Sequence, residues 1–125
     1  MAGDIYIGLD STSPGKCDYN DGYVDSRTFK AFGELLDDAL TEGFPILLEK
    51  IKIYEPMAIY NFFELSKMDF NLAISALRRY IKSLKNPTDW QQVGIWAWNE
   101  VGEPATRKDA RYDFEFHGES PSNGL

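Results

Sequence analysis

The sequence is poor in the side chains that most often bind metals and act as nucleophiles. Its 125 residues include one cysteine, Cys17, and one histidine, His117. A single cysteine excludes an internal disulfide and is typical of a reducing compartment. Zinc sites usually contain several cysteine and histidine ligands, so one residue of each kind argues against a zinc site in this chain. Cys17 and His117 remain the candidates for a nucleophilic pair, although neither lies in a known motif.

Long apolar runs are also missing. No stretch approaches the roughly 18 uninterrupted apolar residues that a membrane-spanning helix needs. The N-terminal segment MAGDIYIGLDS has acidic residues where a signal peptide carries basic ones. We therefore expect a cytoplasmic protein with no membrane contact, consisting of one globular domain at residues 1–117 and a disordered tail at residues 118–125.

Motifs of several functional classes are absent as well. GLDSTSPGKC departs from a phosphate loop, which needs glycine in place of Asp10 and serine or threonine in place of Cys17. An EF-hand placed on Gly22 would have Thr28 at its last ligand position, where a carboxylate is required. No nucleophile elbow, HExxH helix or dinucleotide-binding glycine pattern occurs. We expect no enzyme activity, cofactor or metal, with one alternative left open, an irregular calcium site at Asp18, Asn20, Asp21 and Asp25.

Acidic residues predominate and are unevenly spread. The net charge is −7, and residues 1–64 hold 12 acidic and 5 basic side chains, whereas residues 65–125 hold 8 of each. Such a field repels nucleic acid and anionic membranes and favours approach by a basic partner. Solubility alone is the alternative explanation.

Hydrophobic periodicity predicts an α+β fold. The alternation in DIYIGLD predicts a short N-terminal strand. Central helices are predicted from Ser26 to about Glu42, from Pro56 onward, and over FNLAISALRRYIKSLK, with Ser26 and Asp69 as N-caps. Segment 45–54 suits either a helix or a strand, and we assign it to a helix.

The C-terminal part is predicted to form strands. Segment 90–99, within WQQVGIWAWNE, has apolar residues on both alternating faces, as in a covered strand, although a helix begun by a Thr88–Gln91 capping box is the alternative. RYDFEFH alternates aromatic and polar residues, as in a strand with one wet face. We therefore expect C-terminal strands that form a small, mostly antiparallel sheet.

The acid-rich loop KCDYNDGYVDS and the helix after it hold the candidate binding residues. On the predicted helix, Glu34, Asp38 and Glu42 lie at i, i+4 and i+8, opposite the apolar face. Carboxylates give fast capture of arginine and lysine, and aromatic side chains are rigid interface anchors. We predict one outward patch that binds a partner, formed by Asp18, Tyr19, Asp21, Tyr23, Asp25, Glu34, Asp37, Asp38 and Glu42.

Basic residues gather on the polar side of the predicted helix that starts after Asp69. Arg78, Arg79, Lys82 and Lys85 lie there, and Trp90 follows in sequence. Such a face suits phosphate contacts, but the sequence pI of about 4.6 disfavours nucleic-acid binding, and we expect no direct nucleic-acid contact. Trp96 and Trp98 are expected in the core.

Three segments, DFNLAISALRRYIKSL, GIWAW and KDARYDF, together with small size and acidity, give the chain a family resemblance over residues 69–116. It resembles the small acidic immunity proteins that bacteria make against contact-dependent and other polymorphic toxins. The resemblance implies a non-enzymatic cytosolic protein that binds a cognate toxin domain and blocks its active site or an adjacent surface. The acidic charge makes a basic nuclease the expected target. That family shares no catalytic motif, so no functional residue is carried over.

Other functions stay open at this level. One is a small enzyme or a ligand- or metal-binding protein that uses Cys17, His117 or the acidic loop 18–25. Another is a phage-encoded mimic of nucleic acid that inhibits a host enzyme, and a third is an assembly subunit.

Overall fold

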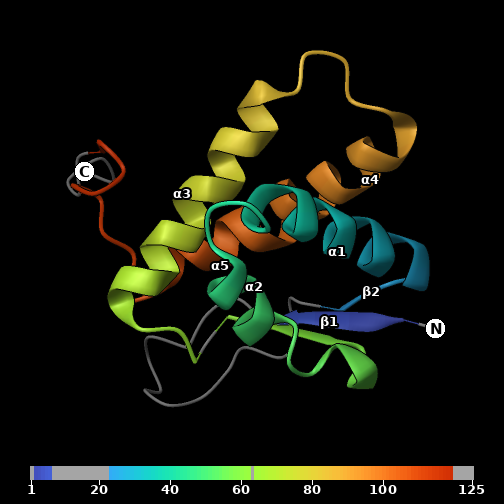
Figure 1. The fold of residues 1–125 in the computed structure, drawn as a ribbon, viewed down its shortest axis with the longest axis horizontal. Helices are drawn as coiled ribbons and strands as arrows, with labels where there is room; N and C mark the ends of the chain where they lie inside the picture. The colour runs from blue at the N-terminus through green and yellow to red at the C-terminus, as the bar shows by residue number, and fades with distance from the viewer. Residues whose placement is uncertain (1, 7–22, 63, 120–125) are drawn as a thin grey trace.

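The computed structural model describes residues 2–6, 23–62 and 64–119. Helices dominate this part of the chain (Figure 1). They are α1 (Ser26–Leu40), α2 (Pro45–Ile51), a 3-10 turn (Glu55–Met57), α3 (Lys67–Ser83), α4 (Asp89–Ala97), a π-helical turn (Trp98–Gly102) and α5 (Glu103–Lys108).

The sheet is small and mixed. Its strands are β1 (Gly3–Tyr6), β2 (Tyr23–Val24) and β3 (Ile59–Asn61), in the order β2-β1-β3. β1 runs antiparallel to β2 and parallel to β3. Ile5 and Tyr60 lie opposite each other in the parallel pair, and both are buried. The sheet therefore supports one side of the helical core.

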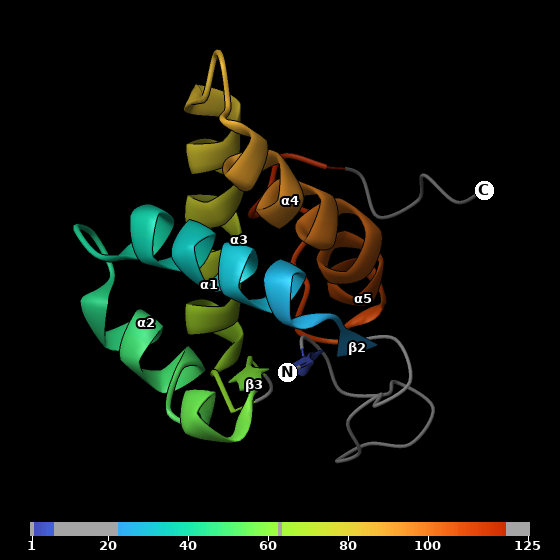
Figure 2. The ribbon, with the colours of Figure 1, turned by 90° about the vertical axis from the view of Figure 1, so that its right-hand side faces the viewer.

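Helix α1 lies at the centre of the molecule. It packs against α3, α4 and β1, and it crosses α3 in Figure 2. Its close approach to α4 depends on Gly94, where an added Cβ would lie 2.8 Å from the carbonyl oxygen of Ala31. The core is made of fully buried apolar side chains from α1, α3, the sheet, the residue after β3 and the π-helical turn, including Ile5, Phe32, Leu36, Leu40, Phe62, Phe70, Ile74, Leu77 and Trp98.

Several predictions for the first half of the chain hold, and others need correction. The N-terminal strand is present, and the helix assigned to segment 45–54 is confirmed as α2. The predicted caps are wrong, because Asp25 caps α1 and Ser66 caps α3. The helix predicted from Pro56 is also wrong. A left-handed Ala58, with φ of 59°, ends the 3-10 turn, and the chain then enters β3.

The predicted C-terminal strands are wrong, and with them the α+β fold class with a mostly antiparallel sheet. Segment 90–99 is helical, and Thr88 and Gln91 form the reciprocal capping box that was the alternative. Segment 111–117 forms turns, in which the Asp113 carboxylate accepts from the Phe116 N–H at 3.1 Å and its carbonyl from the His117 N–H at 3.3 Å. Within the described residues all strands lie before Phe62.

None of the helices in the described ranges combines the length and the apolar character needed to cross a membrane.

Candidate functional site

The structure does not gather all the predicted acidic residues into one patch. Asp18, Tyr19 and Asp21 lie outside the described residues, and only the backbone of Tyr23 is described, in β2. Asp25 stands at the start of α1, where its carboxylate accepts from the Thr28 N–H at 2.8 Å. This hydrogen bond holds the pKa of Asp25 below its ordinary value. Asp25 therefore acts as a helix cap.

Asp37 and Asp38 point to different sides of α1, as adjacent residues on a helix do. The Asp37 carboxylate lies 2.6 Å from Nζ of Lys52, just after α2, and that ammonium group is also 3.4 Å from the Glu55 carboxylate. Asp38 points instead toward α3. Glu42 lies exposed in the turn after α1. Among the members of the predicted set whose side chains the structure describes, only Glu34 and Asp38 line the same groove.

Glu34 and Asp38 line a groove between α1 and the start of α4, here named the α1/α4 groove. Its volume is about 200 Å³, and its other lining residues are Ala31, Leu35, Thr88, Trp90 and Gln91. The indole Nε1–H of Trp90 donates to Glu34 at 2.8 Å, and the Tyr80 hydroxyl donates to Asp38 at 3.3 Å. Each exposed carboxylate is thus oriented by an aromatic donor from another helix.

The local sequence explains this arrangement. The Thr88 capping box fixes the first turn of α4 and so places Trp90 beside α1. Glu34 and Asp38 are one turn apart on α1, so their side chains project in the same direction. Partial burial and the nearby Asp38 raise the pKa of Tyr80 above its ordinary value of 10.0, so the hydroxyl, already protonated at neutral pH, donates over a wider pH range.

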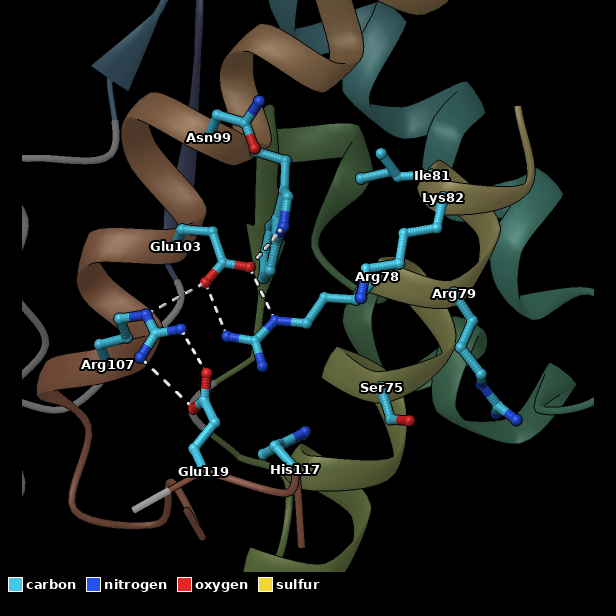
Figure 3. A pocket seen from close by; sticks show the side chains of 11 residues that line it. Ser75, Arg78, Arg79, Ile81, Lys82, Asn99, Glu103, Arg107, His117 and Glu119 are labelled. Atoms are coloured by element: carbon cyan, nitrogen blue, oxygen red, sulfur yellow. Dashed lines mark hydrogen bonds and ion pairs between the residues drawn. The ribbon is translucent and has the colours of Figure 1, made fainter. Parts of the chain in front are cut away.

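A second hollow, here named the α3/α5 pocket, lies between α3, the π-helical turn, α5 and the C-terminal segment (Figure 3). Its volume is about 480 Å³. At its base the Glu103 carboxylate accepts from Arg78 at 2.7 and 2.6 Å and from the Trp98 indole at 2.9 Å. Burial opposes the charge of Arg78, but its bonds to Glu103 and Tyr112 outweigh this cost and raise the pKa of the guanidinium.

Glu119 supplies a second carboxylate to the lining of the α3/α5 pocket. Arg107 donates to Glu119 at 2.6 Å, and the Tyr112 hydroxyl forms a very short hydrogen bond to the same side chain. Hydrogen bonds from Arg107 and then Tyr112 hold the pKa of Glu119 below its ordinary value. Sequence reasoning missed Glu103, Arg107 and Glu119, although Glu103 and Arg107 have the i, i+4 spacing of a helical ion pair.

His117 is held by a buried amide. The Nδ2 group of Asn71 donates to the carbonyls of Lys67 and Arg111, both at 2.8 Å, while its Oδ1 accepts from the Asp113 N–H at 3.0 Å. Nε2 of His117 lies 2.9 Å from that same oxygen. Because an amide oxygen can only accept, Nε2 of His117 must carry a proton, and the neutral ring is the Nε2–H tautomer. Burial lowers the pKa of His117, and Arg78 lowers it further.

The remaining predicted residues add little chemistry. Cys17 lies outside the described residues, so its pairing with His117 is not observed. In the described ranges no three histidine, cysteine, aspartate or glutamate side chains are grouped to hold a metal ion. Trp98 is buried as expected, whereas Trp96 is 54% exposed.

Comparison with protein families, curated proteins and solved structures finds no match to this chain.

Proposed function

We propose that this protein is a cytoplasmic, non-enzymatic binding protein that captures a basic partner protein at the α1/α4 groove. The observation that carries the proposal is the pair of exposed carboxylates, Glu34 and Asp38, each oriented by an aromatic donor. Each carboxylate keeps acceptor positions for arginine or lysine after accepting one hydrogen bond. Trp90 and Tyr80 supply rigid anchors of the kind that dominate interface energetics.

The partner is a toxin domain, and the protein acts as its immunity protein. This part of the proposal rests on the resemblance over residues 69–116 and on the net charge of −7. A nuclease that holds phosphates offers a basic active site, and two fixed carboxylates are suited to occupy phosphate positions.

A growth assay tests both parts. The chain is co-expressed with each toxin-like domain encoded by the neighbouring genes. We expect the wild type to restore growth against one of them and E34Q/D38N to restore it poorly. That variant keeps an acceptor for Trp90 and for Tyr80 but removes both charges. E49Q/E64Q removes two exposed charges elsewhere and is the matched control, which should protect as the wild type does.

Stopped-flow measurements of association between the purified protein and its partner then show how much of the association rate depends on the two charges. E34Q/D38N should associate more slowly than the wild type, with a flatter dependence on salt, because steering by carboxylates is screened by ions. If the wild type neutralises no neighbouring toxin, the immunity function is wrong. If E34Q/D38N and E49Q/E64Q behave alike, the α1/α4 groove is not the binding site.

A further inference from the structure

We propose that the α3/α5 pocket binds a small organic anion that carries a phosphate or carboxylate group. The site is independent of the α1/α4 groove and of the protein partner proposed for it.

The first argument is the charge balance within the pocket. Four cationic side chains line it, Arg78, Arg79, Lys82 and Arg107, against two carboxylates, Glu103 and Glu119. Both carboxylates are already used internally, by Arg78 and Arg107. The lining of this pocket thus has an excess of positive charge, although the net charge of the protein is −7.

The second argument is which groups remain available. In the described part of the chain, the side chains of Arg79 and Lys82 have no ion-pair partner, and both are exposed. Figure 3 shows Lys82 extending toward the Arg78 cluster, whereas Arg79 points outward along α3. Ser75 and Asn99 add a hydroxyl and an amide to the lining. An anion held by Lys82 with such donors is the complementary ligand, and Arg79, which also lines the pocket, adds positive charge beside it.

The third argument is size. A volume of about 480 Å³ exceeds the needs of a bare inorganic ion and falls in the range typical of sites for small organic ligands. Ile81 supplies an apolar wall beside the cationic groups. The base is preorganised, because Glu103 is fixed by Arg78 and the Trp98 indole.

The test uses two-dimensional 1H–15N spectra of the full chain, titrated with AMP, citrate, inorganic phosphate and adenosine. The reporters are the Asn99 amide and the Trp98 indole, and the indole is assigned by comparison with W90F and W96F. We expect AMP and citrate to shift both signals at sub-millimolar to millimolar concentration, phosphate to bind more weakly, and uncharged adenosine to have no effect.

Two double variants decide whether the pocket is responsible. R79A/K82A should weaken AMP binding about tenfold or more, since the charge-assisted contact of Lys82 and the neighbouring positive charge of Arg79 are lost. K85A/K108A removes the same charge from exposed lysines that do not line the pocket and should change the affinity by less than about twofold. Both pairs are exposed, so the spectra should remain those of a folded protein. The proposal fails if no anion shifts the wild-type signals, if adenosine binds as AMP does, or if both double variants weaken binding equally.

Discussion

Arg78 and Glu103 form a two-point ion pair that joins α3 to α5, with Nε 2.7 Å from Oε2 and Nη2 2.6 Å from Oε1. The two side chains are only 18% and 23% exposed. They are 25 positions apart in sequence, so this contact holds α5 against α3.

Removing Glu103 should destabilise the fold strongly. In E103A, Arg78 loses its anionic partner and the Trp98 indole loses its acceptor. We expect the free energy of unfolding to fall by about 2–4 kcal/mol in urea denaturation, because one member of a largely buried pair is left unpaired. E100A, at an exposed position of the π-helical turn, should change it by less than about 0.5 kcal/mol. Equal losses in the two variants would contradict a structural role for this pair.

Gly102 should be intolerant of alanine although alanine favours helices. An added Cβ would lie 2.2 Å from Cε3 of the buried Trp98 ring, so the indole must move. We expect G102A to cost about 1–3 kcal/mol and to change the near-ultraviolet circular dichroism. G43A is the control, since a Cβ there meets no atom within 4 Å. A G102A protein as stable as G43A, with an unchanged spectrum, would show that the Trp98 ring is not confined.

The cap of α1 is testable by comparing two adjacent residues. D25A should lower the melting temperature more than S26A, because Asp25 accepts the Thr28 N–H. The folded-state pKa of Asp25 lies below its ordinary value of 3.8. The stabilisation by its charge is thus present above that ordinary value and is lost as the pH falls through the folded-state pKa. D25N should keep the cap without this pH dependence. A larger drop in melting temperature for S26A than for D25A would show that Ser26, not Asp25, is the N-cap.

His117 should titrate below its ordinary pKa of 6.5, since burial and Arg78 disfavour its charged form. The unfolded chain then binds a proton first as the pH falls. Stability contributed by neutral His117 is therefore present above 6.5 and lost as the pH falls through the lower folded-state pKa.

Imidazole 15N spectra across a pH series give both the pKa and the tautomer of His117. We expect the Nε2–H form at neutral pH, because Asn71 Oδ1 accepts from this nitrogen. The H117Q variant should lose the associated pH dependence of unfolding. A pKa above 6.5, or a neutral Nδ1–H ring, would contradict the hydrogen bonds around Asn71.

Local sequence patterns predicted α1 and α3, apart from their caps, because each has a long apolar stripe. For α2 the pattern suited a helix or a strand, and Pro45 at its start favoured the helix. They failed where a short apolar segment suits more than one structure. The pattern in GIWAW fits a covered strand as well as a buried helix, and the capping box at Thr88 was the better signal. In β3 the parallel partner lies more than fifty positions away, in β1, so no local pattern reveals the pairing.

In the candidate sites, too, some features were visible in the sequence and others depend on the tertiary structure. The helical spacing of Glu34 and Asp38 was visible in sequence, whereas their donors, Trp90 and Tyr80, are supplied by other helices. Asp37 and Asp38 diverge because adjacent helical residues point in different directions, but the partner of Asp37, Lys52 at the end of α2, is supplied by the tertiary structure.

The sequence alone determined the acidic charge, the scarcity of cysteine and histidine, and the amphipathic helices that build the core, because these properties depend on composition and on spacing within a few turns. The tertiary structure decided which acids share a groove, that Arg78 and Glu103 close a pocket, and that the C-terminal aromatic segment forms turns. Those outcomes depend on contacts between residues distant in the chain, whose free energies appear only when the helices pack together.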